Sequence, residues 1–322
     1  MSRHILVPLD GSPLAAAAIP YAVTLAHAEG AKISLLAAIA PPPERVGLSL
    51  DAPWEDGDRQ ESESTAYLAS VAATLRASAL AVTTVVRRGD PASVILAYAA
   101  DAGCSLVVMS THGRTGLDRV RAGSVAQHVL RHAASPTLVV RPGTEAPTSA
   151  DAAIAGITVT LDGSALAEAA LPEATRLAVA LAVPLTLLQV IPSLSYLASA
   201  GWGDGYANYY PASAEQEAAD ALAVEGYLAA VATRLQRPGL EVRTRAERSV
   251  TARVEETIAA YLAARPTGLA VMASHGRGGV LRWVLGSTAE GVLDHAPCLL
   301  LIVRADATID AERAESPVRL GS

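Results

Sequence analysis

The chain has 322 residues, of which 51% are hydrophobic, and its formal net charge is −7 at pH 7. Lys32 is the only lysine and no stretch is rich in Lys or Arg, which excludes an extended nucleic-acid groove because such a groove needs clustered cations. The uncharged run 177–191 is short for a membrane span and contains Pro184, so we expect no membrane partner.

Two further features predict a cytoplasmic location. The chain enters a strand pattern at residues 4–7, with no signal-peptide pattern before it. The two cysteines, Cys104 and Cys298, flank predicted strands, and we expect both to be reduced and buried. Thiols in that state are typical of cytosolic proteins.

Apolar runs alternate with segments of helical periodicity along the first 141 residues. The predicted strands are 4–9, 32–39, 81–86, 106–109 and 138–140, and the predicted helices are 15–28, 63–79, 92–102 and a segment that begins at Ser124. Residues 41–63 are polar and contain four prolines, which predicts a loop. Alternation of this kind predicts a parallel sheet with helices on both faces and a crevice at the carboxyl ends of the strands.

The second half of the chain repeats this plan. Residues 269–304 match residues 106–141 at an offset of 163 positions, and about half of the aligned residues are identical. Asp162-Gly163-Ser164 likewise repeats Asp10-Gly11-Ser12. The strands predicted in this half are 157–161, 185–191, 240–245 and two runs within 269–304, and the predicted helices before that segment are 165–182, 214–235 and 253–264.

The repeat predicts an α/β protein of two tandem, doubly wound, five-stranded parallel-sheet domains of the Rossmann-like type. Residues 142–151 contain two prolines, a glycine and small polar residues, which is typical of a linker. We therefore expect the first domain at 1–143, a linker at 144–153, the second domain at 154–305 and a charged, mobile tail at 306–322.

The glycine-bearing loop 110–123 lies between a predicted strand and a predicted helix, a place suited to an anion. Gly113 allows a phosphate to approach the backbone closely, and unpaired amides at the helix start, beside Gly123 and Ser124, point at it. Arg114 adds a positive charge nearby. Asp10 ends the first strand, which is expected to neighbour the fourth, and a carboxylate there accepts bonds from ribose hydroxyls or holds a divalent cation. Together these residues predict a nucleotide site.

A simpler alternative is a tight loop whose glycines serve turn geometry. In that case Asp10 or Ser12 caps the following helix, and Ser124 acts as a helix cap rather than as a phosphate donor. Because the aspartate and the glycine loop recur together in both halves, we favour the binding interpretation.

The repeated motif resembles that of the universal stress protein family. ATP-binding members carry Gly-x2-Gly-x9-Gly-Ser/Thr, and this chain has Ser110-x2-Gly113-x9-Gly123-Ser124 and Ala273-x2-Gly276-x9-Gly286-Ser287. The last two glycines and the hydroxyl match in both copies, whereas a small residue replaces the first glycine. The resemblance covers nearly the whole chain and implies a fold like that of the adenine nucleotide α-hydrolases.

The resemblance implies an ATP-binding sensor or regulator of the stress response, with one nucleotide site in each domain and Mg²⁺ accompanying the ATP. It implies ribose contacts from Asp10 and Asp162, adenine contacts from the second strands and phosphate contacts from the glycine loops. The candidate binding residues of the first domain are Pro8, Leu9, Asp10, Ala38, Met109, Ser110, His112, Gly113, Arg114, Gly123, Ser124 and Val125. Those of the second domain are Asp162, Val190, Met272, Ala273, His275, Gly276, Arg277, Gly286, Ser287 and Thr288. Family members also pair through edge strands, here 137–141 and 300–304, which implies an intramolecular pseudo-dimer of the two domains and leaves room for a homodimer.

Two other functions stay open from the sequence. One is a slow ATPase or an adenylate-transferring enzyme, although no base or arginine clamp is evident beyond Arg114 and Arg277, and we assign no catalytic residue. The other is a dimerisation or interaction module that binds no nucleotide, which the small residues Ser110 and Ala273 would suit.

Several local patterns are interpreted as structural. His112 and His275 are expected to form hydrogen bonds rather than to act as acid or base. His128 and His132 lie four residues apart on a predicted helix, and we expect a solvated helix face there rather than a metal site. The glycine triplet within 201–205 follows no strand-to-helix turn and is interpreted as a loop, and the P-loop sequence is absent.

Overall fold

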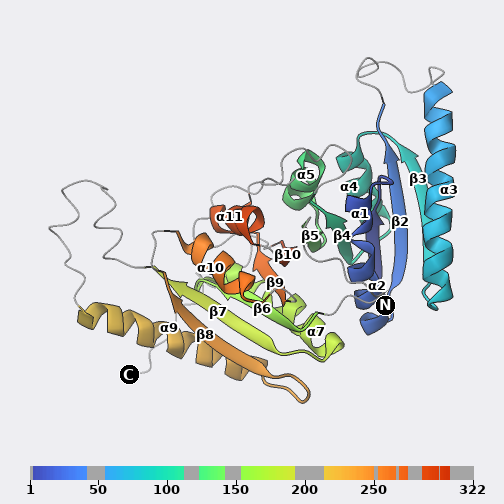
Figure 1. The fold of residues 1–322 in the computed structure, drawn as a ribbon. Helices are drawn as coiled ribbons and strands as arrows, with labels where there is room; N and C mark the ends of the chain where they lie inside the picture. The colour runs from blue at the N-terminus through green and yellow to red at the C-terminus, as the bar shows by residue number, and fades with distance from the viewer. Residues whose placement is uncertain are drawn as a thin grey trace, which may run out of the picture. The chain divides into compact units, whose positions relative to one another are not determined.

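The computed structural model describes residues 3–41, 55–111, 123–141, 154–192, 214–249, 253–265, 268–274, 285–296 and 298–304. The chain divides into two compact units, Met1–Ala153 and Ile154–Ser322. Each unit is an α/β body built around a five-stranded parallel sheet (Figure 1). The predicted α/β fold with two tandem domains is therefore confirmed.

The sheet of the first unit has the strand order β3-β2-β1-β4-β5, and every pair is parallel. Its strands are β1 (His4–Pro8), β2 (Lys32–Ile39), β3 (Val82–Arg88), β4 (Leu106–Ser110) and β5 (Thr137–Val140). Its helices are α1 (Pro13–Ala16), α2 (Ile19–Glu29), α3 (Glu55–Ala77), α4 (Pro91–Asp101) and α5 (Ser124–His132). The reversal of strand order at β1 and β4 creates a crevice at their carboxyl ends, where open α/β sheets bind ligands.

The sheet of the second unit repeats this order as β8-β7-β6-β9-β10, again with parallel pairs throughout. Its strands are β6 (Gly156–Leu161), β7 (Leu185–Ile191), β8 (Val242–Arg248), β9 (Gly268–Ala273) and β10 (Leu299–Val303). Its helices are α6 (Ala165–Glu168), α7 (Leu171–Leu181), α9 (Ala214–Leu235), α10 (Val254–Ala263) and α11 (Ser287–His295). Strand β8 begins and ends later than the predicted strand 240–245.

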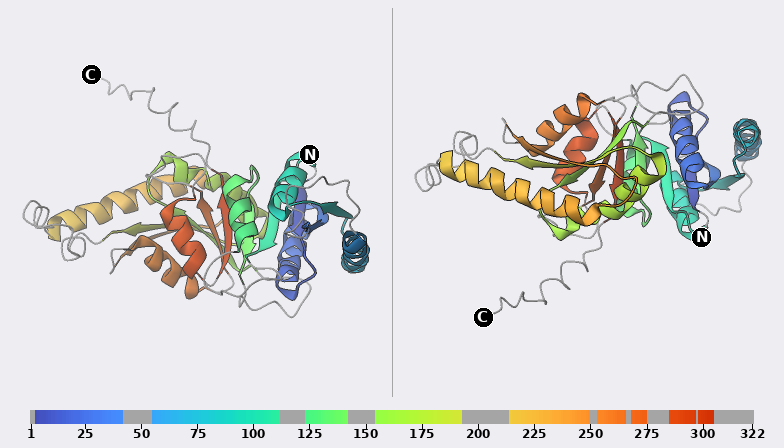
Figure 2. Two further views of the ribbon diagram at one scale, coloured as in Figure 1. Left: turned by 90° about the horizontal axis from the view of Figure 1, so that it is seen from above. Right: turned by 90° about the horizontal axis from the view of Figure 1, so that it is seen from below.

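Helices cover both faces of each sheet. In the first unit α4 and α5 pack on the face that carries Leu6, Leu36 and Val107, and α2 and α3 lie on the opposite face (Figures 1 and 2). All three of these residues are completely buried. Burial on both faces explains why the strands are continuous apolar runs rather than alternating ones.

One predicted helix in each unit is divided in the structure. The expected helix 15–28 is split into α1 and α2, and the expected helix 165–182 is split into α6 and α7. Pro20 and Pro172 stand at the starts of the second pieces. A proline lacks the N–H that would bond to the preceding turn and its ring clashes with that turn, so the helix must restart there.

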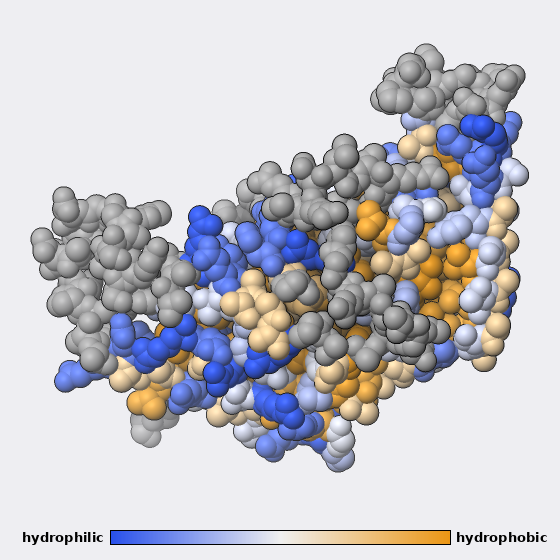
Figure 3. Space-filling model, viewed as in Figure 1, coloured by the Kyte–Doolittle hydropathy of each residue, from blue (hydrophilic) through white to orange (hydrophobic). Residues whose placement is uncertain are grey.

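Helix α3 begins at Glu55, eight residues before the predicted start, so the prediction of a loop up to residue 63 was wrong. Residues 55–62 lack apolar periodicity, which is why the helix was missed. Arg88 of β3 forms ion pairs with Asp58 and with Glu61. The first turns of α3 are thus held to the sheet by charge, and its N-terminal part is hydrophilic at the surface while apolar side chains are visible beside it (Figure 3).

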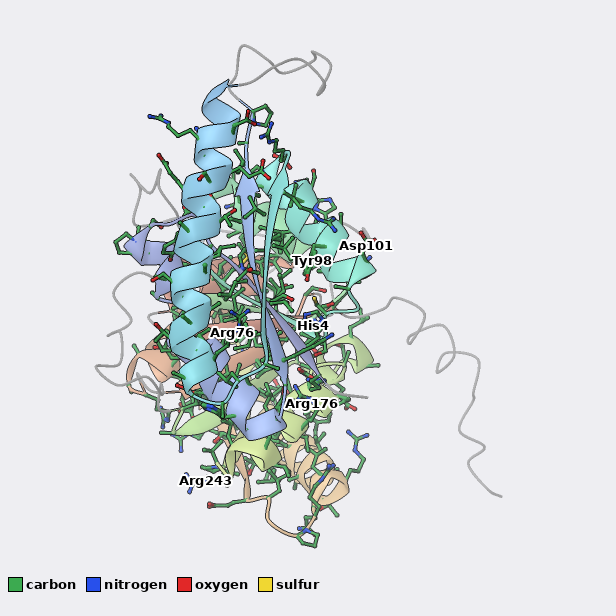
Figure 4. The ribbon with its side chains drawn as sticks, turned by 90° about the vertical axis from the view of Figure 1, so that its right-hand side faces the viewer. His4, Arg76, Tyr98, Asp101, Arg176 and Arg243 are labelled. Atoms are coloured by element: carbon green, nitrogen blue, oxygen red, sulfur yellow. The ribbon has the colours of Figure 1, made fainter. Side chains whose placement is uncertain are left out.

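A buried polar chain crosses the first sheet at the amino ends of its strands. His4 Nε2 lies 2.8 Å from Ser34 Oγ, and that hydroxyl also contacts Thr83 Oγ1 at 2.7 Å and Tyr98 Oη at 2.9 Å (Figure 4). Burial lowers the pKa of His4, a bond to the Ala102 carbonyl partly opposes this, and Lys32 lowers it further. This network lies far along the strands from the carboxyl-end crevice, so we interpret it as structural.

Neither cysteine forms a disulfide and both are buried, as the sequence predicts. Burial raises the pKa of the Cys104 thiol to about 11, so the thiol is protonated and unreactive at neutral pH. Within the described part of the chain, no helix is long and apolar enough to cross a membrane.

Candidate functional site

A cavity of about 660 Å³ lies at the carboxyl ends of β1, β2 and β4 in the first unit. Its size is typical of pockets for small ligands. Nine residues that the sequence singled out line it: Pro8, Leu9, Asp10, Ala38, Met109, Ser110, Gly123, Ser124 and Val125. Segments more than 100 residues apart in sequence thus meet at the predicted place.

Asp10 stands at the end of β1, where the chain turns into α1. One carboxylate oxygen, Oδ1, accepts the backbone N–H of Ser12 at 2.9 Å, and the Ser12 hydroxyl in turn accepts the N–H of Ala15 at 3.1 Å. Ser12 is therefore the helix cap, and Asp10 holds the turn in front of it. This anchoring fixes the Asp10 carboxylate at the wall of the cavity.

The amino end of α5 forms another wall. Gly123 is its N-cap, and the first bond within the helix runs from Gln127 N to Gly123 O at 3.0 Å. The amides of Ser124, Val125 and Ala126 therefore have no acceptor within the helix, and all three residues line the cavity. Such amides and the positive end of the helix dipole attract an anion. The alternative in which Ser124 caps the helix is wrong, because Gly123 occupies the cap position.

A backbone hydrogen bond closes the neck of the glycine loop. The N–H of Gly123 donates to the carbonyl of Thr111 at 2.7 Å, and the N–H of Thr111 donates to Val140 of β5 at 3.0 Å. A Cβ atom on Gly123 would lie 3.0 Å from that Thr111 oxygen. This close approach gives a physical reason for glycine at residue 123.

Helix α3 supplies a wall that the sequence prediction missed. Its residues Gln60, Glu63, Ser64 and Tyr67 all line the cavity. Burial, and to a lesser degree the nearby charge of Asp10, raises the pKa of the Tyr67 phenol. A signal was present in the sequence, because a Tyr-Leu-Ala run at residues 67–69 recurs at 227–229.

The second unit places its predicted residues in the same way. Asp162 Oδ1 accepts the N–H of Ser164 at 2.9 Å, and Gly286 is the N-cap of α11. The N–H of Gly286 donates to Ser274 O at 2.8 Å, which closes the second glycine loop as in the first unit. Val190 is the last residue but one of β7, Met272 and Ala273 end β9, and Ser287 and Thr288 begin α11.

The environment of Tyr227 distinguishes the two units. Its phenol donates to Glu168 Oε1 at 3.1 Å, and Arg234 donates to Glu168 Oε2 at 2.8 Å. Burial is the largest cause of the raised pKa of Tyr227, followed by Glu168 and Asp162. In the first unit alanine, Ala16, takes the place of Glu168, so the phenol of Tyr67 has no such carboxylate.

A family model described as the universal stress protein family matches residues 1–141 and 156–304. The chain belongs to the universal stress protein family. The match falls in two segments, one for each unit, as the internal repeat predicts.

Known universal stress proteins resemble either one unit or the whole chain. A universal stress protein of Mycolicibacterium smegmatis is 26% identical over 306 residues, which is 93% of this chain and 96% of that protein. Universal stress protein MJ0531 of Methanocaldococcus jannaschii is 31% identical over 140 residues, which is 43% of this chain and 82% of that protein. The crystal structure of a universal stress protein from Archaeoglobus fulgidus is 19% identical, covers 94% of this chain and 99% of that one, and has a TM-score of 0.67, which supports the fold.

Some predicted residues of this universal stress protein lie outside the described residues. They are His112, Gly113, Arg114, His275, Gly276, Arg277 and the glycine triplet within 201–205. Their roles stay predictions.

His128 and His132 lie together on α5, with ring centroids 4.2 Å apart. His132 Nδ1 is 2.8 Å from the His128 carbonyl oxygen. Across the described residues, no group of three or more His, Cys, Asp or Glu could hold a metal ion. The pair therefore has no third protein ligand of these types among those residues.

Proposed function

We propose that this universal stress protein binds an adenine nucleotide, ATP accompanied by Mg²⁺, and that it acts as a sensor or regulator of the stress response. One observation carries the proposal. In the first unit, a single cavity joins an anchored carboxylate, the end of β2 and the amino end of a helix. These are the groups that ribose, a base and phosphates require.

Each wall has a separate role in the proposed complex. The amides of Ser124, Val125 and Ala126 hold phosphate oxygens, and Gly123 permits their close approach. The Asp10 carboxylate accepts from the ribose hydroxyls, and backbone at Ala38 meets the adenine ring. Bound Mg²⁺ would neutralise phosphate charge, and carboxylates such as Asp10 are the oxygen ligands that it prefers.

Calorimetric titration of the full chain with ATP and Mg²⁺ tests the proposal. We expect up to two sites per chain, one in each domain. An Asp10→Ala, Ser124→Ala variant should weaken the first site selectively, because it removes a carboxylate acceptor and a hydroxyl at the helix start. No heat at millimolar ATP would contradict the proposal.

We also propose that the two domains pair within one chain, as the family resemblance implies for residues 137–141 and 300–304. The support is that β5 and β10 are each an outer strand in the sheet of their own unit. Cleavage within the linker 144–153 should then leave the two halves associated during gel filtration. Separation of the halves at micromolar concentration would contradict the pairing.

A further inference from the structure

A buried amide in the second unit has an oxygen that no described residue binds. Gln189 lies in β7, the residue is 9% exposed, and among the described residues no group donates a hydrogen bond to its Oε1 atom. An amide oxygen removed from water without a replacement donor destabilises the folded chain. An unmatched acceptor of this kind therefore needs either a structural explanation or a ligand that supplies the donor.

The position of Gln189 is equivalent to a lining position of the first unit. Ala37 and Gln189 each come 27 residues after the aspartates, Asp10 and Asp162. The strand registers agree, because Val7 pairs with Leu35 and Val159 pairs with Leu187, so both positions lie two residues further along equivalent strands. Ala37 lines the cavity of about 660 Å³.

The side chain of Gln189 faces the helix that carries Tyr227. Side chains alternate along a strand, and Leu36 belongs to the core formed with α4 and α5. Ala37 therefore points to the opposite face, toward α3 and Tyr67. By the same register, Gln189 points toward α9.

The phenol of Tyr227, on the helix that Gln189 faces, already donates its hydrogen bond elsewhere. The Tyr227 phenol donates to Glu168, and Glu168 is also bound by Arg234. A phenol has a single proton to donate, so Tyr227 does not satisfy Gln189 while it holds Glu168. The donor must come from elsewhere, and the equivalent place in the first unit is the ligand cavity.

We propose that Gln189 is a specificity-determining residue of the second domain, whose amide oxygen accepts a hydrogen bond from an N–H or O–H group of the bound nucleoside. The inference rests on the proposed nucleotide function. The donor is the exocyclic amino group of the base or a ribose hydroxyl. In the first domain the methyl side chain of Ala37 offers no acceptor, so that site tolerates nucleotides that lack this group.

The test uses the full chain with the first site weakened by Asp10→Ala and Ser124→Ala. Its probes are ATP, purine riboside triphosphate, 2′-deoxy-ATP and 3′-deoxy-ATP, each titrated calorimetrically in the presence of Mg²⁺. Gln189→Met keeps the length of the side chain and removes its amide. We expect about tenfold weaker binding of ATP to this variant, because one hydrogen bond to a buried group is lost.

The analogues identify the donor through coupling. One of the three should bind about tenfold more weakly than ATP when Gln189 is present and should lose nothing further in Gln189→Met. The reciprocal variant Ala37→Gln, in a chain weakened instead at the second site by Asp162→Ala and Ser287→Ala, should transfer the discrimination to the first domain. If the melting curve of Gln189→Met shows that this variant does not fold, the Ala37→Gln variant alone tests the role of the amide.

The outcomes separate this inference from the function on which it rests. Equal affinity of Gln189→Met and the parent for ATP overturns the inference and leaves nucleotide binding intact. Loss of affinity for ATP and for all three analogues alike also overturns it, because then no ligand group is coupled to the amide. If the parent chain with the first site weakened binds no ATP, a role for Gln189 toward nucleotides is overturned while the first site stands. If the unaltered chain binds no ATP, both proposals fail.

Discussion

The two domains have the same strand order and the same anchored aspartate, yet they differ beside the helix that faces the crevice. In the first domain Tyr67 of α3 and Ala37 line the same cavity. In the second, Tyr227 of α9 is bound to Glu168, and Gln189 replaces the alanine. The glycine N-caps of α5 and α11, which suit phosphate, are therefore the same in both domains. The side chains around Tyr67 and Tyr227 differ.

The amino ends of α5 and α11, where phosphate is proposed to bind, also differ in charge. Gln127 lies in the first turns of α5, and the equivalent residue of α11 is Glu290. A carboxylate there stabilises the helix but repels an approaching phosphate. Under the proposed function, these differences predict two nucleotide sites of unequal affinity and selectivity, with stronger anion binding in the first domain.

The largest effect on stability should come from shortening the side chains at the equivalent core positions Leu68 and Leu228, which are 0% and 1% exposed. Leu68→Ala and Leu228→Ala should each lower the free energy of unfolding by about 2–5 kcal/mol, because each leaves a cavity. Hydrogen exchange measured peptide by peptide should place each loss in the unit that carries the substitution. Equal losses in both units from either variant would show that the two domains do not behave as separate cores.

A smaller effect should separate the two tyrosines. Tyr227→Phe leaves Glu168 with one donor fewer and should cost about 1 kcal/mol of stability. Tyr67→Phe removes a phenol for which no hydrogen bond is seen among the described residues, so denaturant unfolding should show a change within about 0.5 kcal/mol. Equal losses of stability in the two variants would show that the bond from Tyr227 to Glu168 does not stabilise the second domain.

Substitutions that change the charge in the first turns of α11 and α5 should have a smaller effect, on the affinity for ATP. Glu290→Gln should strengthen ATP binding in the second domain by about two- to fivefold, since one repulsive charge near a helix end contributes about 0.3–1 kcal/mol. Gln127→Glu should weaken the first domain to a similar degree. Titrations at low and high salt provide the control, because a charge effect shrinks with screening.

The smallest expected effect concerns acid. Burial lowers the pKa of His4 below its ordinary value of 6.5, so the unfolded chain binds the proton more readily than the folded one. The stability that neutral His4 contributes is thus present above pH 6.5 and declines as the pH falls below 6.5. Gly156 occupies the equivalent position of the second domain, which lacks this dependence. The free energy of unfolding, measured between pH 7.5 and 5.5, should depend less on pH in His4→Gln than in the parent chain. The same pH dependence in both would contradict a contribution from His4.

The regular elements could be predicted wherever the apolar pattern was continuous. Strands β2 and β7 and helix α9 have the predicted bounds. The start of α3 could not be predicted, because ion pairs from Arg88, a residue distant in sequence, hold its polar first turns. The restart of α2 at Pro20 was readable from proline chemistry and was missed.

The candidate site was predictable on its strand and loop sides only. Asp10, Ser110 and Gly123 follow from local motifs, and the cavity brings them together. Glu63 carries no signal in the sequence, and Tyr67 is marked only by its recurrence as Tyr227. The place of both residues beside the site depends on how a long helix crosses the sheet. The change from Ala37 to Gln189 is visible in the sequence when the second strands are aligned through Asp10 and Asp162.

The hydrogen bond between Gly123 and Thr111 has a consequence for how this chain could be altered. The bond ties the residue after β4 to the N-cap of α5, so the sheet and α5 are joined by a contact between residues outside 112–122. Closing a somewhat longer or shorter segment across a fixed neck changes the entropy only slowly with length. Residues 112–122 can therefore be replaced while this hydrogen bond is kept. Inserting residues 275–285 between Thr111 and Gly123 would give the first domain the loop sequence of the second domain.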